Sequence, residues 1–483
     1  MNRVTRSFVL LVLLATVLSS CAINPVTGRR ELSLVSPQQE LAIGREGYKA
    51  VAAEYGLYAD PALQAYVDQV GQKVAKASHM PELVWHFTVL DDPVVNAFAM
   101  PGGYIYVTRG ILAHMESEAQ LAGVLGHEIG HVTSRHSASQ LTQQQLYGLG
   151  LGVASIASKT VAKYGDLAQQ GLSLLFLKYS RDDEREADDL AVKYAAAAGY
   201  DPREIPATYV MLERLGEDSG SRLPSFLSTH PDPGDRVNTT AALARQAMQG
   251  RSNLVVNGRD YLQRLDGLAF GEDPRQGHFA GDVLYHPALR FAMTLPAGWK
   301  HQNSRAAVAS QEPGQKAVLQ LSLADAGALS PEAFAQRLVT AGKVAGAQGR
   351  AETIGGFPAW VGRLTIPQEG AAPALLTAGW VRRADTLMFQ VLGRSQQPGD
   401  ADEAKVLASL RSIRALTDAA RLGVTSDRVK VEKVAATGTL QAVLQKLGAA
   451  SAQLATDARI NGLEPDETVR AGTLLKRVVP GKR

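Results

Sequence analysis

Five consecutive residues have the types and the spacing to hold a metal ion and use it: His127, Glu128, Ile129, Gly130 and His131. Residues four apart lie on one face of a helix, so both imidazoles can reach the same zinc ion. Glu128 would lie beside the open coordination position, where a zinc-bound water has a pKa of about 7. The spacing therefore predicts peptide hydrolysis by a zinc-activated water, with Glu128 as the general base.

The neighbouring residues predict the helix that must carry this motif. Ser117 and Gln120 form a capping-box pair at its start. Apolar residues follow at helical spacing, namely Leu121, Val124, Leu125 and Ile129. We expect one continuous helix from Glu118 to Leu141.

A second predicted helix offers the third protein ligand that a catalytic zinc ion commonly has. Ser180 can cap its start, and acidic residues fill its first turn. Glu184 and Asp188 lie four residues apart, on one face. Glu184 suits a zinc ligand, and Asp188 suits an acceptor that holds a histidine ring in place. Glu186 is expected to face solvent.

His136 raises the alternative that a third histidine binds the metal, as in metzincins. That arrangement needs a glycine three residues after His131 and a histidine three residues further on. Ser134 and Ser137 hold those two positions. We therefore expect His136 behind the ligands or on the helix surface.

These motifs resemble the family that contains the integral-membrane CAAX prenyl proteases, and more closely its periplasmic BepA-like metalloproteases. Other segments that match are NPVTG at 24–28, NAFAMPGG at 96–103, THP at 229–231, and Arg236. Together they cover roughly residues 22–245. The resemblance implies one Zn²⁺ per chain, with His127, His131 and Glu184 as ligands, Glu128 as the base and Asp188 behind the ligands.

The resemblance also implies that a proline-flanked loop containing His230 passes near the metal, with Arg236 after it. His230 could be a fourth ligand that displaces the catalytic water and keeps the enzyme latent. It could instead donate a hydrogen bond to the oxyanion of the transition state. Latency predicts that His230→Ala raises proteolysis, whereas lower turnover with zinc retained would indicate the second role.

Two β-prone runs, 94–100 and 104–108, are joined by a Pro-Gly-Gly turn and predict a hairpin. If Asn96, Ala97 and Phe98 lie on an exposed edge, a substrate segment can add there as an extra strand. Such an enzyme would prefer unfolded chains. An ordinary internal hairpin is the alternative, and the resemblance favours the substrate-binding edge.

The first 20 residues resemble a bacterial lipoprotein signal. Two arginines precede an apolar run at 8–18, and Leu-Ser-Ser-Cys at 18–21 resembles a lipobox. The run is about half of the ~20 residues that a membrane-spanning helix needs. The resemblance implies cleavage before Cys21 and lipid on its thiol, and Ala22 favours an outer-membrane anchor facing the periplasm.

Composition excludes several classes of protein. Cys21 is the only cysteine, so an intrachain disulfide is excluded, and so is a thiol protease once that sulfur is lipidated. A formal net charge of +3 without a basic run gives no case for nucleic acid binding. Residues 146–177 are rich in Gly, Ala and Leu, but charges interrupt them, so we expect helices over the cleft rather than a membrane span.

The expected fold is multidomain: a mainly α-helical zincin-type (gluzincin) peptidase domain with a small β-sheet, then an α+β domain and a small βααβ module that resembles LysM. The expected boundaries are 1–20 for the signal, 21–250 for the peptidase domain, 251–285 for a linker, 286–418 for the α+β domain and 428–480 for the module. LysM modules bind peptidoglycan, and packing or protein docking is the alternative role for this module.

Two functions are consistent with the sequence. The favoured one is a zinc metalloendopeptidase that cleaves misfolded or unassembled envelope proteins in the periplasm. The alternative is a wall-associated, chaperone-like lipoprotein with little proteolysis. The complete set of His127, Glu128, His131 and Glu184 favours the first.

Overall fold

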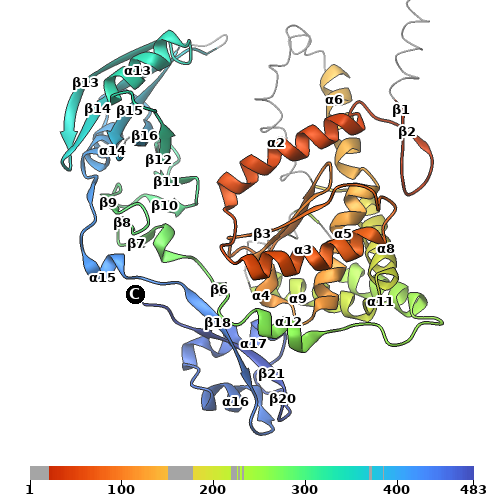
Figure 1. Cartoon of the computed structure of the whole chain (residues 1–483). Helices are drawn as coiled ribbons and strands as arrows, with labels where there is room; N and C mark the ends of the chain where they lie inside the picture. Colours follow the sequence, from red (N-terminus) through yellow and green to blue (C-terminus); the bar gives the residue numbers. More distant parts are fainter. Residues whose placement is uncertain are drawn as a thin grey trace, which may run out of the picture. The chain divides into compact units, whose positions relative to one another are not determined.

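The computed structural model describes residues 21–150, 178–218, 226, 229–230, 233–368, 373–384 and 386–482 (Figure 1). The chain divides into two compact units. Unit 1 contains Met1–Gly271 and Arg428–Val479, and unit 2 contains Glu272–Asp427 and Pro480–Arg483. The predicted signal at 1–20 and most of the segment 146–177 lie outside the described residues.

Unit 1 begins with a short hairpin and two helices that lead into a three-stranded sheet. These elements are β1 (Cys21–Ile23), β2 (Arg30–Leu32), α2 (Pro37–Tyr55), α3 (Pro61–Lys76), β3 (His86–Leu90), β4 (Ala97–Met100) and β5 (Tyr104–Thr108). The strand order is β3-β5-β4, with β4 antiparallel to β5. The predicted hairpin is confirmed, and β4 lies at one edge of this sheet among the described residues.

Helix α5 (Glu118–Thr133) carries the H-E-x-x-H motif. The Ser117 hydroxyl accepts from the backbone N–H of Gln120 at 3.2 Å, whereas the Gln120 side chain accepts from Glu116 rather than from Ser117. The helix therefore starts where the sequence predicts, although its cap is not the reciprocal capping box.

The predicted continuation of α5 to Leu141 is wrong, because Arg135 has left-handed backbone conformation with φ 57°. That conformation costs about 1–2 kcal/mol for a residue other than glycine. Contacts with α2 offset the cost: the guanidinium pairs with Glu40 and donates to the carbonyl oxygen of Val35 at 3.0 Å. A separate helix, α6 (His136–Gly150), starts directly afterwards.

Helix α8 (Arg181–Ala197) packs closely against α5. It begins with the predicted cap, in which Ser180 and Asp183 accept from each other's backbone N–H groups at 3.1 and 2.9 Å. A Cβ added to Gly130 would lie 3.2 Å from the Cα of Ala187. A Cβ added to Gly126, one helical turn earlier in α5, would lie 3.2 Å from the Cα of Ala191. Glycines that face alanines therefore let the two helices approach.

The remaining helical elements of the first part of unit 1 are α4 (Arg109–His114), η1 (Pro202–Glu204), α9 (Ile205–Asp218), α11 (Pro233–Ala247) and α12 (Gly258–Arg264). Helix α9 packs against both α5 and α11, and α8 also packs against α11. One hydrophobic core joins these helices to α3 and the sheet. No helix among the described residues combines the length and hydrophobicity that crossing a bilayer requires.

The C-terminal part of unit 1 has the predicted order of strand, helix, helix and strand. Its elements are β18 (Asp427–Lys433), β19 (Gly438–Thr439), α16 (Leu440–Lys446), η3 (Ser451–Gln453), α17 (Leu454–Ile460), β20 (Thr468–Val469) and β21 (Leu474–Val479). Its main sheet has the order β21-β18-β6, so it includes β6 (Ala269–Phe270) from before unit 2. The segment 428–479 is therefore built into unit 1.

Unit 2 is rich in antiparallel β-structure. A seven-stranded sheet has the order β10-β11-β12-β16-β15-β14-β13, and a four-stranded sheet has the order β17-β9-β8-β7. Helices lie between some of these strands, in agreement with the α+β pattern expected for 286–418. The elements are η2 (Pro274–Gln276), β7 (His278–Ala280), β8 (Val283–His286), β9 (Phe291–Thr294), β10 (Lys300–Asn303), β11 (Ala307–Gln311), β12 (Val318–Asp325), α13 (Pro331–Thr340), β13 (Gly346–Ile354), β14 (Phe357–Ile366), β15 (Ala374–Arg382), β16 (Leu387–Arg394), α14 (Ala401–Arg411), β17 (Arg414–Ala415) and α15 (Ala419–Leu422). Residues 251–285, predicted as a linker, contain α12, β6, β7 and most of β8.

Candidate metal centre

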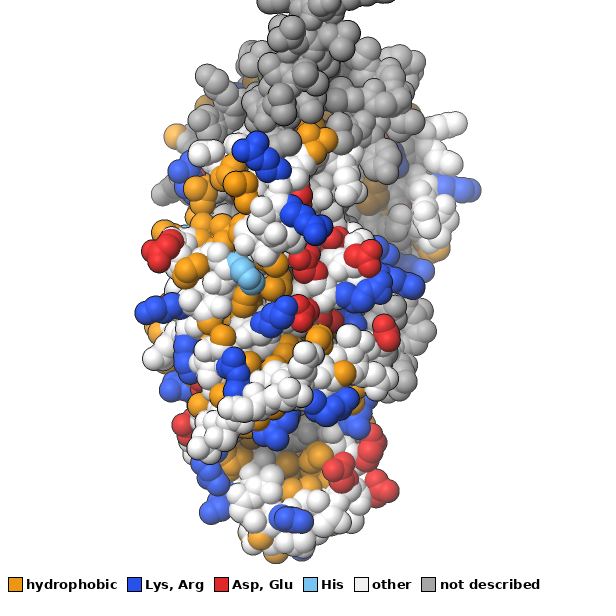
Figure 2. Space-filling view, turned by 90° about the vertical axis from the view of Figure 1, so that its right-hand side faces the viewer, with side chains coloured by type: hydrophobic (Ala, Val, Ile, Leu, Met, Phe, Trp, Pro, Cys, Tyr) orange, Lys and Arg blue, Asp and Glu red, His pale blue; other side chains and the backbone are white. Residues whose placement is uncertain are grey.

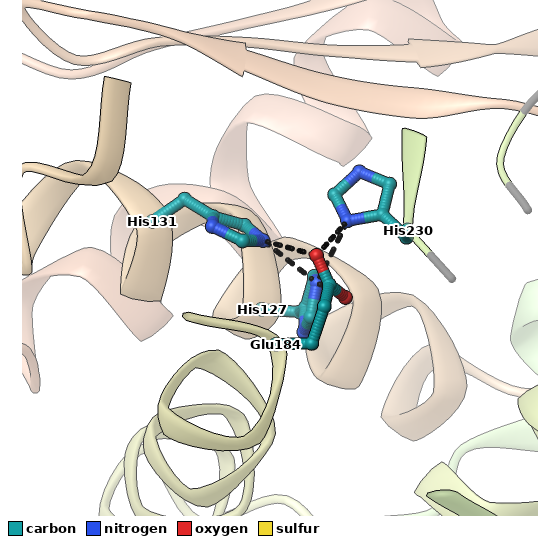
Figure 3. Close-up of side chains that lie close together, drawn as sticks. All are labelled: His127, His131, Glu184 and His230. Carbon is teal, nitrogen blue, oxygen red and sulfur yellow. Dashed lines mark hydrogen bonds and ion pairs between the residues drawn. The ribbon is translucent and has the colours of Figure 1, made fainter. Parts of the chain in front are cut away.

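Four side chains of unit 1 converge on one point (Figure 3). His127 and His131 come from α5, Glu184 from α8, and His230 from just before α11. Each side chain is buried and offers one ligand atom, and the four atoms lie within 4.8 Å of one another. The structure thus brings the three predicted ligands together with His230.

The separations of the donor atoms fit a tetrahedral zinc site. Nε2 of His127 is 3.0 Å from Nε2 of His131 and 3.5 Å from Oε2 of Glu184. Nδ1 of His230 is 3.3 Å from Nε2 of His127 and 3.0 Å from Oε1 of Glu184. Ligands about 2.1 Å from a zinc ion at tetrahedral angles lie about 3.4 Å apart. Two or three imidazoles with one carboxylate is also a donor set that zinc accepts.

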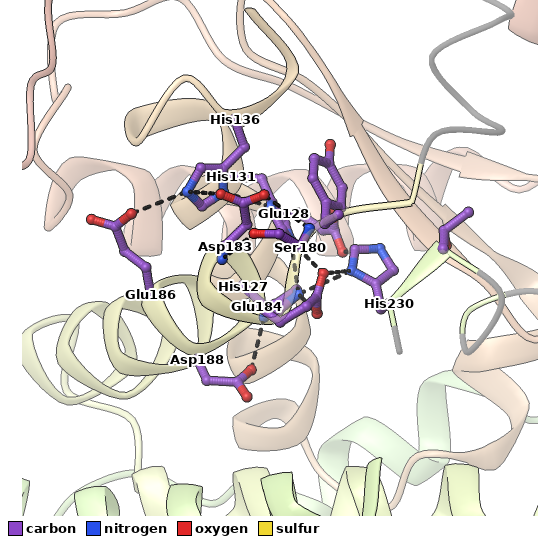
Figure 4. Close-up of polar contacts among 12 residues, drawn as sticks. His127, Glu128, His131, His136, Ser180, Asp183, Glu184, Glu186, Asp188 and His230 are labelled. Carbon is purple, nitrogen blue, oxygen red and sulfur yellow. Dashed lines mark hydrogen bonds and ion pairs between the residues drawn. The ribbon is translucent and has the colours of Figure 1, made fainter. Parts of the chain in front are cut away.

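Asp188 holds His127 in the orientation that metal binding requires (Figure 4). Its Oδ1 lies 3.0 Å from Nδ1 of His127. When Nδ1 carries the proton, Nε2 keeps its lone pair for a metal. Asp188 also accepts from Nε of Arg236 at 2.8 Å and from the Tyr209 hydroxyl at 2.5 Å. Since Nη1 of Arg236 lies 2.8 Å from Oε2 of Glu184, one guanidinium holds both carboxylates.

A chain of two contacts holds His131 in the same way. Nδ1 of His131 lies 2.9 Å from Nδ1 of His136, and Nε2 of His136 lies 3.1 Å from Oε2 of Glu186. If each ring donates towards the carboxylate, Nε2 of His131 is left with a lone pair directed at the other donors. His136 therefore lies behind a ligand, and the expectation that Glu186 simply faces solvent is wrong (Figure 4).

Glu128 is fully buried, and neither of its carboxylate oxygens accepts a hydrogen bond in the structure. Nε2 of His230 lies 3.8 Å from its Oε1. Buried polar atoms without partners are rare, so these oxygens suit a site in which their partner is a metal-bound water. Burial raises the pKa of Glu128 above its usual value, which makes this carboxylate a better proton acceptor than an exposed glutamate.

The ligands affect one another's protonation. Burial alone would lower the pKa of His127, but hydrogen bonds with Asp188 and Glu184 raise it to about 9. Burial, together with the neighbouring charge of His127, lowers the pKa of His131 well below its usual value. Burial opposes ionisation of Glu184, yet the charges of His230 and His127 lower its pKa. A metal ion therefore competes with a proton on His127.

Three aromatic side chains at the site were not predicted from the sequence. The ring of Tyr179 stacks on His131 with centroids 3.9 Å apart, and Phe226 stacks on His230 at 4.4 Å. Tyr209 contacts Asp188, as described above. Tyr179 could have been found from the sequence, because it directly precedes the predicted cap Ser180. No local sequence pattern marks Phe226 or Tyr209.

The candidate edge strand lies close to the same loop. Asn96, Ala97 and Phe98 are buried, and the carbonyl oxygen of Asn96 accepts from the backbone N–H of Thr108 at 3.0 Å. In an antiparallel pair, the backbone N–H and C=O groups of alternate residues point to the neighbouring strand. Those of Asn96 point to β5, so those of Val95 and Ala97 point away from β5, to the free edge. The N–H of Phe226 donates to the carbonyl oxygen of Val95 at 3.4 Å. The segment before His230 therefore contacts the start of this edge.

Comparison with known proteins is consistent with this geometry. Residues 61–244 match the model of Peptidase family M48. The mitochondrial metalloendopeptidase OMA1 of Arabidopsis thaliana is 39% identical over 169 residues, which are 35% of this chain and 33% of that protein. The beta-barrel assembly-enhancing protease of Escherichia coli is 29% identical over 251 residues, 49% of this chain and 50% of that protein. The putative beta-barrel assembly-enhancing protease of Vibrio cholerae is 29% identical over 263 residues, 50% and 52% of the two chains.

The chain spans about half the length of the beta-barrel assembly-enhancing proteases and a third of the Arabidopsis protein. The matched residues contain α5 and α8 and all four converging donors. Residues 61–244 therefore resemble Peptidase family M48, in a chain that is similar to the beta-barrel assembly-enhancing proteases over about half of its length.

Proposed function

We propose that this protein is a zinc metalloendopeptidase that cleaves misfolded or unassembled cell-envelope proteins in the periplasm. The observation that carries the proposal is the convergence of His127, His131 and Glu184 beside the buried Glu128. One Zn²⁺ per chain, when bound, supplies a Lewis acid and lowers the pKa of a coordinated water.

The protein's own residues do the rest of the work. Glu128 takes a proton from the attacking water and passes it to the leaving amide nitrogen, and its raised pKa suits both transfers. Asp188 and His136 keep the two imidazoles oriented with their lone pairs towards the metal position. Arg236 fixes Glu184 and Asp188 relative to each other.

His230 is proposed to keep the enzyme latent. Its Nδ1 supplies a fourth donor, and a site with four protein donors has no position for the attacking water. Movement of the loop before α11 would remove this donor and open the site. The other role is still open, because Nε2 of His230 faces Glu128 and could donate to an oxyanion after the loop moves.

Substrates are proposed to bind along β4. An extended segment that pairs with Ala97 would use backbone hydrogen bonds, which any unfolded chain can offer. The contact between Phe226 and Val95 already uses part of this edge, so substrate binding and movement of the His230 loop are expected to occur together. The similar beta-barrel assembly-enhancing proteases support an envelope role by their names.

Two further parts of the proposal concern location. The lipobox supports attachment of lipid at Cys21 and an outer-membrane anchor.

The C-terminal segment has two candidate roles, glycan binding and packing. Packing is favoured because Lys476 of β21 is fully buried against the peptidase domain. Peptidoglycan binding remains a possible second role of its surface.

The proposed function is tested with casein and an unfolded outer-membrane protein as substrates. The purified protein is expected to cleave both, and a zinc chelator is expected to stop it. Glu128→Gln should reduce turnover at least about a thousandfold while one zinc per chain is retained. Asp189→Asn, on the exposed face of α8, is the matched control. Equal behaviour of wild type, Glu128→Gln and chelated protein would favour the chaperone-like alternative.

A further inference from the structure

Exposed apolar side chains gather around one groove in unit 1. We call these side chains the apolar surface. They are Ile23, Leu32, Leu41 and Val84, which are 61%, 45%, 47% and 69% exposed. Single exposed apolar residues are ordinary, but a cluster indicates contact with an apolar partner. Figure 2 shows a face of the molecule on which hydrophobic side chains gather beside Lys and Arg.

The groove makes this surface continuous. It has a volume of about 410 Å³ and is lined mainly by apolar residues, including Ile23, Leu41, Met80 and Leu83. Val84 follows Leu83 directly in the chain. The only charged residues in the lining, Glu40 and Arg135, form an ion pair with each other. The groove therefore offers no unpaired charge to a polar ligand.

The hairpin of β1 and β2 ties the apolar surface to Cys21. In the antiparallel pair, Cys21 lies opposite Leu32, and Ile23 lies opposite Arg30. Side chains that lie opposite each other, or two residues apart on one strand, share a face. Ile23 and Leu32 therefore share a face of the hairpin whose first strand begins at Cys21.

The charges on the hairpin favour an anionic partner. Arg29 and Arg30 are exposed, and so is the one acid of the hairpin, Glu31 of β2, which accepts a hydrogen bond from Asn24 at 2.9 Å, so positive charge is in excess. Exposed basic side chains next to an apolar area are the combination that binds anionic lipid headgroups while apolar groups enter the acyl boundary.

We propose that the apolar surface docks on a lipid bilayer that contains anionic headgroups. Ile23, Leu32, Leu41 and Val84 enter the headgroup boundary, and Arg29 and Arg30 contact the headgroups. The choice of a bilayer rather than a protein partner rests on the proposed lipid attachment at Cys21, which would bring a bilayer to this hairpin. Docking would then fix the orientation of the peptidase unit, since one lipid attachment alone leaves it free to rotate.

The test separates docking from lipid attachment. Residues 21–483 with Cys21→Ser are produced without the signal and mixed with vesicles of phosphatidylcholine, with or without phosphatidylglycerol. The bound fraction is measured by flotation. Binding to the anionic vesicles is expected, and Ile23→Ser/Leu32→Ser/Val84→Ser should weaken it at least about tenfold, because less apolar area enters the bilayer. The matched control is Leu323→Ser/Leu375→Ser, which changes two residues of unit 2 that are 42% and 43% exposed.

Casein cleavage without vesicles is measured for every variant, and it should be unchanged. This shows that the variants are folded and keeps failure of docking distinct from failure of the peptidase assignment. The proposal is overturned if the Cys21→Ser protein does not float, or if the triple variant floats as well as the control. It is also overturned if the triple variant changes the oligomeric state or casein cleavage, since those results would assign the surface to a second copy or to substrate. Equal flotation with neutral vesicles would overturn the role of Arg29 and Arg30.

Discussion

Nζ of Lys476 lies 2.6 Å from Oε1 of Glu116, and both side chains belong to unit 1. The lysine also donates to the carbonyl oxygens of Ala113 and Met115 at 2.9 and 2.8 Å. Glu116 directly precedes Ser117, the cap of α5. A fully buried lysine near the end of the chain thus holds the segment from which the H-E-x-x-H helix starts.

Lys476→Met is expected to destabilise unit 1 by about 1–3 kcal/mol, because it removes the cation from Glu116, whose side chain is 33% exposed, and leaves two carbonyl oxygens without their donor. The measurement is urea unfolding followed by the fluorescence of Trp85, a residue of the unit 1 core. Lys430→Met is the control in the same segment, since Lys430 and Asp266 form an exposed pair worth about 0–1 kcal/mol. The double change Lys476→Met/Glu116→Gln should recover part of the loss, and equal effects of both single lysine variants would contradict a buried ion pair.

His230→Ala is expected to raise casein cleavage several-fold at saturating zinc, because it removes the fourth donor and opens a position for water. Zinc content should remain at one per chain, held by His127, His131 and Glu184. His86→Ala, which removes an exposed histidine outside the cluster, is the control. Reduced cleavage with zinc retained would instead assign His230 to the transition state.

Gly130→Val tests the close approach of α5 and α8. A Cβ at this position would lie 3.2 Å from the Cα of Ala187, so a larger side chain must push the helices apart. We expect a loss of about 2 kcal/mol and weaker zinc binding, since Glu184 moves with α8. Gly130→Ala should cost less, because alanine favours the helix by about 0.5–1 kcal/mol. Zinc titration and thermal unfolding measure both effects, and zinc affinity unchanged in the valine variant would contradict the packing argument.

Asp457→Asn is expected to stabilise the protein at neutral pH. Asp457 is buried, only one of its oxygens accepts a hydrogen bond, from the N–H of Val478, and burial raises its pKa from 3.8 to about 6. As the pH rises from about 4 to 6, the unfolded chain releases this proton while the folded protein keeps it. The contribution of Asp457 to the free energy of unfolding is therefore fully present below pH 3.8 and is lost as the pH rises through about 6.

The asparagine variant removes that loss, so it should be about 3 kcal/mol more stable than wild type at neutral pH and equally stable at about pH 3, below both pKa values. Chemical unfolding at the two pH values measures this difference. Asp466→Asn, at an exposed position of the same segment, should show no such dependence on pH. A gain that is equal at both pH values would show that protonation is not its cause.

Local spacing predicted much of the candidate site. His127, His131, Glu184 and Asp188 lie at four-residue intervals on two helices, and the structure brings all four together. Ser180 marked the start of α8 because capping is local chemistry. The strands of unit 2 were also visible, since their apolar patterns belong to short segments.

Long-range contacts account for what could not be predicted. The end of α5 depends on the pairing of Arg135 with Glu40, which is 95 residues away, and no local pattern encodes it. The burial of Lys476 depends on carbonyl groups more than 360 residues away. Tyr209 reaches Asp188 only because α9 packs against α11 and α11 packs against α8.

The sheet β21-β18-β6 has a consequence for synthesis of the protein. Strand β6 ends at Phe270, and its partner β18 begins at Asp427, after nearly all of unit 2 has been made. The third strand of that sheet, β21, also follows unit 2 in the chain. The first part of unit 1 therefore cannot complete this sheet until unit 2 has been synthesised, and until then it lacks the lysine that holds the start of α5. The order of synthesis thus delays the folding of the unit that carries the candidate metal centre.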